Sequence, residues 1–479
     1  MVDLTPGEKR WTIVYGKNAA VEQYALTELY RNWQFYVPYV LPLREAAGVD
    51  LTTLEHVLLV GTAESNPRIA ELMARGVLAA PPGAQGYSLW IGEAPWEAKH
   101  RLIVVAGADA AGMLYGVQEL LASLSDETVP LDKPVRRRSF LAELPNRALC
   151  EAPAVRQRGI WTWGYVIYDY RRFLDQMARL KMNMLTVWNS EAPLNLTELA
   201  HEAHRRGIQL IAGYGWGYGH PFSLENDADR AAIKQMALEV YRKEYAGQPI
   251  DGIYFQTITE HTNQEVGGRT VADWCHEMVN EIAAELYAEN PTLSIQFGLH
   301  ATSIRAHYTD LAQLDPRMII TWEDAGDLPF SYWPKADEYE ATLAYAKELA
   351  AFRPGTPFAL VPKGWMTLRW DDEWAKHGPF LLGEREPAYL RERLTARQRE
   401  WDSINVEWYR LFPLAARFYR EVLQINPHML VTGLVEDALF EARIQPSVAL
   451  FGEMLWNPYR EDADLLARAM RAYNCATTV

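Results

Sequence analysis

Runs of apolar, β-branched and aromatic residues alternate with amphipathic segments along most of this 479-residue chain. In the first part, four apolar runs predict strands and three segments of helical spacing predict helices. The strands are expected at residues 11–15, 56–60, 87–91 and 102–106, and the helices at 19–33, 70–75 and 110–124. This pattern is typical of a small α/β domain, which we assign to residues 1–145. Residues 125–138, with two prolines and three consecutive arginines, are expected to form a linker.

From about residue 158 the pattern becomes a regular repeat of strand and helix. Eight apolar runs predict strands at 159–163, 184–188, 208–212, 252–258, 293–297, 318–322, 358–361 and 429–432. Eight strands alternating with helices are typical of a closed barrel. The predicted fold class is therefore α/β, a (β/α)8 TIM barrel preceded by a small α/β domain. The barrel domain is assigned to residues 146–479, with an insertion around 371–413 that contains a charged helix at 384–407.

The net charge and the cysteine content indicate which binding partners and which compartment to expect. The formal net charge is -15, which disfavours nucleic acid and anionic membranes because both need a basic surface. The three cysteines, Cys150, Cys275 and Cys475, match no zinc or redox spacing, and such a sparse set fits a reducing compartment. The first residues do not form the apolar core of a signal peptide, and no apolar run is long enough to cross a membrane. We expect a cytoplasmic protein, and the sequence leaves a homo-oligomer open.

Acidic residues follow two of the predicted barrel strands. Glu260 comes after the run 252–258, and Glu323 and Asp324 follow the run 318–322. Barrel enzymes carry their acid and base groups at these strand ends, and two carboxylates across one cavity can hydrolyse a glycosidic bond. We predict Glu260 as the general acid and one of Glu323 and Asp324 as the base or nucleophile, since neighbours in an extended chain point to opposite sides. The structural alternatives are a solvated or salt-bridged loop Glu and an acidic turn.

The chain contains 17 tryptophans, more than a soluble protein of this length usually has. A large core explains part of this, but sugar rings also pack their C–H faces on indole. Residues at or near predicted strand ends are therefore candidates for substrate binding. They are Trp161, Trp163, Trp188, Asn189, Trp216, Tyr254, Gln256, His261, His300, Trp322, Lys363, Trp365 and Glu453. Each tryptophan could equally be a core residue, and Glu453 could be a structural Glu after the last strand.

Two other site types receive less support. The stretch 213–219 is glycine-rich, but aromatic residues interrupt it and no helix opens at its last glycine, so we do not expect a nucleotide site or any other cofactor. His201 and His204 are three residues apart, not the four of a zinc-binding helix. His220, His261 and His300 could converge on a metal, which keeps a metal-assisted hydrolase or lyase as an alternative. No metal ligand is assigned.

Several segments resemble β-hexosaminidases and α-glucuronidases. Residues 85–89, 103–109 and 112–118 resemble the small domain that precedes the barrel in both families, and residues 158–163 and 173–184 resemble the start of the barrel. Residues 251–260 resemble the α-glucuronidase segment that ends in the general-acid Glu, and 451–458 resemble that family's final barrel segment. The resemblance implies a glycoside hydrolase, with Glu260 as the acid and Lys363 as a residue that binds a carboxylate.

The chain departs from both families near Glu260. Thr259 stands where β-hexosaminidases place an Asp, and Gln256 stands where α-glucuronidases place a Lys. Residues 365–370 also contain no match for the base Asp of α-glucuronidases. We therefore predict an exo-acting glycoside hydrolase of a small oligosaccharide or glycoside, linked through a uronic acid or an N-acetylhexosamine. A barrel that binds sugar without cleaving it is the second alternative.

Overall fold

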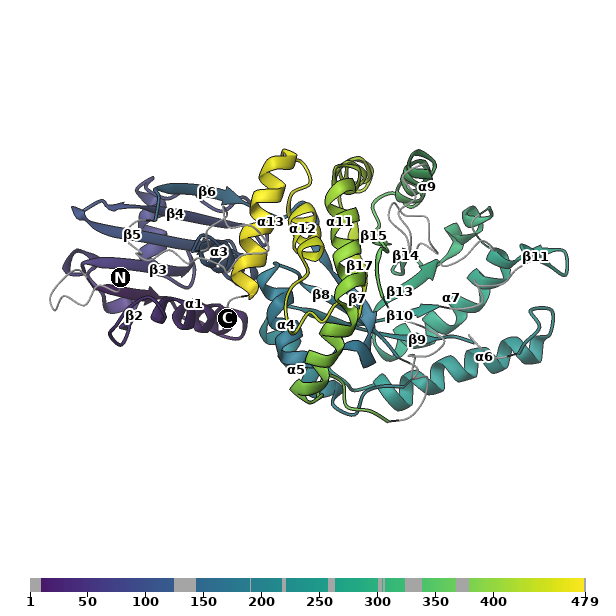
Figure 1. Cartoon of the computed structure of the whole chain (residues 1–479). Helices are drawn as coiled ribbons and strands as arrows, with labels where there is room; N and C mark the ends of the chain where they lie inside the picture. The colour runs from purple at the N-terminus through teal and green to yellow at the C-terminus, as the bar shows by residue number, and fades with distance from the viewer. Residues whose placement is uncertain are drawn as a thin grey trace.

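The computed structural model shows a small sheet domain beside a closed barrel (Figure 1). It describes residues 10–124, 144–189, 191–217, 221–256, 263–299, 304, 306–323, 338–367 and 379–477, with side chains up to residue 473. None of the helices in these ranges combines the length and the apolar character that a membrane crossing requires.

The small domain is a six-stranded sheet covered on both faces by helices. Its strand order is β2-β1-β3-β5-β4-β6, and β4 runs antiparallel to its two neighbours. Alternate residues of β3 enter two separate cores: Leu58 and Val60 pack with α1 and α3, and Val57 and Leu59 pack with α2. The elements are β1 (Trp11–Tyr15), α1 (Val21–Gln34), β2 (Leu43–Glu45), β3 (His56–Thr62), α2 (Pro67–Ala74), β4 (Tyr87–Ala94), β5 (Glu97–Gly107), α3 (Ala110–Ala122) and β6 (Arg147–Glu151).

The four strands and three helices predicted for this domain are confirmed, and two strands were missed. The edge strand β2 has only three residues, all exposed, so it carries no apolar pattern. The strand β6 pairs with β4 and keeps the chain in the first sheet as far as Glu151, beyond the boundary predicted at residue 145. Alternate residues of β6 are exposed, so this strand does not form a continuous apolar run in the sequence.

The second sheet closes into the predicted (β/α)8 barrel. Its eight parallel strands follow one another in chain order, and β17 pairs with both β7 and β15 to close the ring. The strands are β7 (Gln157–Trp163), β8 (Met184–Trp188), β9 (Gln209–Gly215), β10 (Gly252–Gln256), β13 (Ser294–Leu299), β14 (Ile319–Glu323), β15 (Phe358–Val361) and β17 (Leu430–Glu436). The short β16 (Trp365–Met366) adds to β17 outside the ring, and β11 (Glu265–Val266) and β12 (Arg269–Thr270) form a separate hairpin.

Helices surround the barrel (Figure 1). They are α4 (Tyr170–Arg179), α5 (Leu196–Arg205), α6 (Asp227–Val240), α7 (Val271–Glu289), α9 (Tyr339–Phe352), α11 (Pro387–Ile425), α12 (Pro446–Trp456) and α13 (Asp462–Thr477). The helix predicted at 384–407 is part of α11, which has 39 residues and continues through Pro413. Proline removes one helical hydrogen bond, but Leu411, Phe412 and Ala415 around it are buried against the barrel, so packing keeps the helix continuous.

A network of buried charges joins the small domain to the C-terminal helices. Glu119 on α3 lies 2.9 Å from Lys181, 2.9 Å from Arg147 and 3.4 Å from Arg468 on α13. Lys181 also lies 3.2 Å from Glu453 on α12. Burial alone would raise the pKa of Glu119, but the three cations hold it well below its ordinary value. The two domains are therefore joined by ion pairs as well as by apolar packing.

We predict that Glu119→Gln destabilises the whole protein. The substitution leaves three cations without a shared buried anion, and breaking a buried ion pair costs about 3–5 kcal/mol. The same network predicts a loss of stability at low pH, because an acid whose pKa is lowered on folding stabilises the protein only while it is ionised. This loss begins as the pH falls below 4.5, the ordinary pKa of the group, so urea unfolding at pH 7 and at pH 3 measures both effects.

Glu71→Gln is the matched control. Its partner Arg68 lies 3.1 Å away, but the Glu71 side chain is 49% exposed, so the loss should stay below about 1 kcal/mol. Equal effects of the two substitutions would contradict the role given to the network.

Candidate active site at the barrel mouth

The C-terminal ends of the barrel strands, called the barrel mouth below, hold a buried carboxylate. Glu323 is the last residue of β14 and is 5% exposed. Lys363 Nζ lies 3.1 Å from Glu323 Oε1, and the Tyr254 hydroxyl and the Gln256 side-chain amide donate hydrogen bonds to Oε2. Three donors around one carboxylate stabilise its negative charge in a site with little water. These three donors thus hold the Glu323 carboxylate in place, facing into the barrel.

Strand register explains how these donors meet. Glu323 pairs with Val361 of β15, so Lys363 stands two residues beyond and on the same face. Tyr254 comes from β10, on the far side of β13. A Cβ atom at Gly298 of β13 would lie 2.4 Å from the Tyr254 hydroxyl oxygen. Glycine at this position therefore gives Tyr254 the room to reach across β13 to Glu323.

Four aromatic side chains fill the barrel beside this carboxylate. Trp161 and Trp163 come from β7, Trp188 from β8 and Tyr254 from β10, and we call them the aromatic cluster. Trp161 and Trp188 stack with ring centroids 6.2 Å apart, and Tyr254 meets both edge-on at 5.7 and 5.9 Å. All four are at most 5% exposed. Flat apolar rings next to a charged group are typical of a site for a ligand with both apolar and polar surfaces.

A second buried carboxylate at the mouth was not predicted. Glu436 ends β17, is fully buried, and accepts a hydrogen bond of 2.5 Å from Trp163 Nε1. The sequence prediction ended the last strand at residue 432, four residues before this position. The segment 433–437 reads GLVED, an apolar run ending in Glu-Asp like TWED at 321–324, and this repeat could have identified Glu436.

Asp437, the next residue, points toward α11. Its Oδ1 accepts a 2.8 Å hydrogen bond from the Tyr168 hydroxyl, and its Oδ2 lies 2.6 Å from Arg393 and 3.2 Å from Arg397. Burial raises the pKa of Asp437, and Arg393, Tyr168 and Arg397 oppose that rise. Burial and the Asp437 carboxylate together raise the pKa of Tyr168, so its hydroxyl remains a donor.

Glu441 lies in the same connection after β17. Its Oε1 accepts hydrogen bonds from the backbone N–H groups of Tyr168, at 2.5 Å, and Asp169, at 3.3 Å. Among the described residues, no group donates to its buried Oε2. Burial raises the pKa of Glu441 to about 7, and the backbone donors oppose this rise. Glu441 is thus a buried acid that titrates near neutrality.

The structure brings seven of the sixteen predicted site residues together at the mouth. They are Trp161, Trp163, Trp188, Tyr254, Gln256, Glu323 and Lys363. Asn189 directly follows β8, and its side-chain amide packs against Gly164, where a Cβ atom would lie 2.4 Å from Nδ2. This convergence connects β7, β8, β10, β14 and the loop after β15.

Four predicted substrate-binding residues pack elsewhere, away from Glu323. Trp216 stacks on Phe255 with centroids 3.5 Å apart, in the core outside the barrel. Trp322 belongs to the same outer core, because it precedes Glu323 on the strand and so faces the other way. Trp365 stacks on Trp408 of α11 with centroids 3.9 Å apart. Glu453 lies in the domain interface, 3.2 Å from Lys181 and 3.1 Å from Arg460.

Four other candidates lie outside the described residues. They are Glu260, Asp324, His261 and His300. Their roles stay predictions, and so does the metal alternative, which needs His220, His261 or His300. Within the described part of the chain, no group of three or more His, Cys, Asp and Glu side chains could hold a metal ion. His204 Nε2 lies 2.8 Å from Asp251 Oδ2, before the start of β10 and at the opposite end of the barrel from the mouth.

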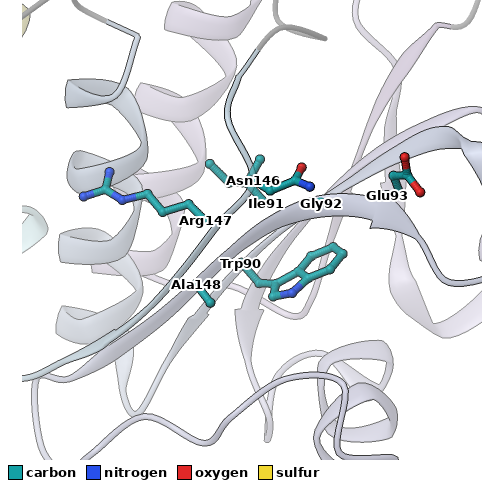
Figure 2. A pocket seen from close by; sticks show the side chains of 7 residues that line it. All are labelled: Trp90, Ile91, Gly92, Glu93, Asn146, Arg147 and Ala148. Atoms are coloured by element: carbon teal, nitrogen blue, oxygen red, sulfur yellow. The ribbon is translucent and has the colours of Figure 1, made fainter.

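A hollow on the small domain does not contribute to this site. It has a volume of about 470 Å³ and lies along β4 and the start of β6. Figure 2 shows Trp90, Glu93 and Arg147 among its lining residues, and none of the seven belongs to the barrel. This hollow is therefore separate from the barrel mouth, which remains the candidate active site.

Comparison with known proteins gives structural likeness only. No protein-family model and no curated protein matches the chain. A mutant β-hexosaminidase from Streptomyces plicatus, in complex with its product GlcNAc, is 12% identical, with 78% of this chain and 75% of that chain covered and a TM-score of 0.43. A GH20 β-N-acetylhexosaminidase from Streptomyces coelicolor A3(2) is 13% identical, with coverages of 78% and 75% and a TM-score of 0.44. A family 89 glycoside hydrolase from Clostridium perfringens is 9% identical, with coverages of 95% and 50% and a TM-score of 0.45. Likeness at this level does not indicate a shared activity.

We predict that Gly298→Ala and Tyr254→Phe are coupled. The added methyl group collides with the Tyr254 hydroxyl, and such overpacking costs about 1–3 kcal/mol. When the hydroxyl has already been removed, the methyl group should cost less. Urea unfolding of the two single variants and the double variant measures this difference. Strict additivity would show that Gly298 does not provide the space for Tyr254.

We also predict that Glu441→Gln reduces the pH dependence of stability. The pKa of Glu441 is raised from 4.5 to about 7, so the folded state holds its proton more tightly than the unfolded state. Stability should therefore fall as pH rises between these values, by on the order of 3 kcal/mol. The Glu441→Gln variant has no carboxyl group at this position, so its stability should not show this decrease. Unfolding at pH 5, 6, 7 and 8 gives the two curves, and parallel curves would disprove the assignment.

Proposed function

We propose that this protein is a glycoside hydrolase, exo-acting on a small oligosaccharide, with Glu260 as the general acid and Glu323 as the base or nucleophile. The observation that carries this proposal is the buried Glu323 carboxylate, held by Lys363, Tyr254 and Gln256 beside the aromatic cluster. In such a reaction, an acid protonates the leaving oxygen while a carboxylate acts on the anomeric carbon or its water.

The geometry favours Glu323 over Asp324 for the second role. Glu323, the last residue of β14, faces the barrel interior. Its three donors stabilise the ionised form that a base or nucleophile needs. Retention would require about 5 Å between the carboxyl groups of Glu260 and Glu323, and inversion about 6.5–9.5 Å.

The covalent chain supports Glu260 as the partner. Gln256 is the last residue of β10, and its side chain reaches Glu323. Glu260 follows four residues later, and four residues span at most about 14 Å when fully extended. Glu260 is therefore within reach of the barrel mouth, where it would have to meet the bond that is broken.

The neighbouring side chains support a sugar as substrate. The aromatic cluster forms the floor of the mouth beside Glu323, and indole and phenol rings are surfaces on which the C–H faces of a pyranose pack. Glu436 places a carboxylate beside Trp163, where it could accept hydrogen bonds from sugar hydroxyl groups. We assign Glu436 to substrate binding on this basis.

The proposed glycon is an N-acetylhexosamine or a uronic acid, and the Lys363 contact favours the first. A uronate would need a cation, but Lys363 already lies 3.1 Å from Glu323. Sharing it between two carboxylates weakens both pairs. A neutral glycon avoids this cost.

A set of aryl glycosides that differ in leaving group tests the proposal. For Glu260→Gln, kcat/KM should fall by roughly 10²–10⁴-fold on substrates with poor leaving groups, and less on good ones, because these need no proton. For Glu323→Gln, the loss should be similar across the set. Glu239→Gln, on the exposed surface of α6, is the control and should behave as wild type.

Three results would count against the proposal. The first is an equal loss on all substrates for Glu260→Gln. The second is full activity of a folded Glu323→Gln variant. The third is a wild-type protein that cleaves no glycoside, with Glu260→Gln binding sugar as tightly as wild type, which would indicate a binding protein.

A further inference from the structure

The connection after β17 contains two residues with an unfavourable backbone conformation. Asp437 and Leu439 both have φ of 53°, in the left-handed region that non-glycine residues rarely adopt. Such residues persist where surrounding contacts hold them in place, and they are frequent at functional sites. Here the strained residue directly follows Glu436, so the turn at Asp437 sets where that carboxylate points.

The contacts that hold Asp437 come from two distant parts of the chain. Tyr168, after β7, donates to Oδ1, and Arg393 of α11 lies 2.6 Å from Oδ2. Trp401 of α11 donates a 3.0 Å hydrogen bond to the backbone oxygen of Asp437. Side chain and main chain are both fixed, which explains how the left-handed conformation is maintained.

Asp437 is not placed to react with a substrate itself. It is 1% exposed, and both of its oxygens are engaged by Tyr168, Arg393 and Arg397. It also follows Glu436 on the chain, and Glu436 faces Trp163 in the barrel. Its effect on a ligand must therefore act through Glu436.

Helix α11 is part of the same assembly. Leu390 and Leu394 from its first turns pack with Tyr168 and Leu439 in the core that also contains the aromatic cluster. The first part of α11 thus covers the rim of the barrel between β17 and β7. Since Arg393 lies between these two leucines, the helix places a cation on Asp437 from the rim.

We propose that Tyr168, Asp437 and Arg393 form a positioning triad that connects α11 to the barrel mouth and fixes Glu436 and Trp163 for the ligand. The kinetic part of this proposal rests on the proposed function, because it takes Glu436 as a binder of sugar hydroxyl groups. The structural part does not: it states that the Trp163–Glu436 hydrogen bond depends on the triad.

Tyr168→Phe is the sharpest variant, because it removes one hydroxyl and leaves the ring in place. Asp437→Asn keeps the shape but removes the charge. The first measurement needs no substrate: the indole N–H signal of Trp163 in a ¹⁵N-labelled protein, identified by its loss in Trp163→Phe. Glu436→Gln shows where this signal lies when the acceptor has no charge.

We expect the Trp163 signal to move in Tyr168→Phe, Asp437→Asn and Arg393→Met in the same direction as in Glu436→Gln. Arg417→Met is the matched control, because Arg417 is also a paired arginine of α11, with partners 2.7 Å away in Glu340 and Glu421. Its Trp163 signal should stay at the wild-type position. A wild-type signal in Tyr168→Phe would overturn the proposal, even if Asp437→Asn failed to fold.

The second measurement separates binding from chemistry. On a cleaved glycoside, Tyr168→Phe should raise KM roughly tenfold and change kcat less, because a weakened ground-state contact acts mainly on binding. An unchanged KM with a shifted Trp163 signal would overturn the link between the triad and the ligand. If wild type cleaves no glycoside, the proposed function fails, and the Trp163 signal still decides whether the triad exists.

Discussion

The arrangement of the barrel mouth depends on the pairing of β17 with β7. This pairing closes the ring, so that all eight strands end around one space and alternate residues of each strand enter it. A closed interior excludes water, and charges inside it must find partners within the protein. Glu323 meets Lys363, Tyr254 and Gln256, and Glu436 meets Trp163. Closure therefore both gathers these side chains and requires them to contact one another.

Large side chains inside the ring occupy the space left by glycines on neighbouring strands. Trp188 of β8 lies against Gly213 of β9, where a Cβ atom would lie 2.8 Å from the indole. Tyr254 of β10 uses the space at Gly298 of β13 in the same way. A large inward residue on one strand thus depends on a missing side chain on the next. The glycines of the run 213–219 that resembled a nucleotide motif begin with such a position, and this packing explains why glycine occurs there.

The sequence predicted the elements better than the side-chain contacts, for reasons that particular residues illustrate. The eight barrel strands were predictable because buried parallel strands are continuous apolar runs. The outward position of Trp322 could also have been predicted, although the sequence analysis placed Trp322 among the substrate-binding candidates. An inward Glu323 requires an outward Trp322, because neighbouring residues of a strand face opposite sides. The position of Trp365 was not predictable, because its stacking partner Trp408 lies on a helix whose position no local pattern reveals. The ion pair of Glu453 was not predictable for the same reason, because its partner Lys181 is 272 residues away in the chain. Glu436 was not predicted because the sequence analysis ended the last strand at residue 432, whereas β17 continues to Glu436.

Buried carboxylates in two regions of the described chain differ in how their charges are compensated. In the domain interface, Glu119 faces Lys181, Arg147 and Arg468, and its pKa is lowered on folding, as expected of a group that stabilises the structure. After β17, Glu441 accepts hydrogen bonds from backbone N–H groups, and burial raises its pKa to about 7. A buried carboxylate whose pKa is raised on folding reduces stability near neutral pH, and perturbed acids of this kind are frequent at functional sites. The left-handed Asp437, four residues before Glu441, adds to that cost. A strained residue and a buried acid with a raised pKa thus coincide in the connection after β17, which is the combination expected of a functional site.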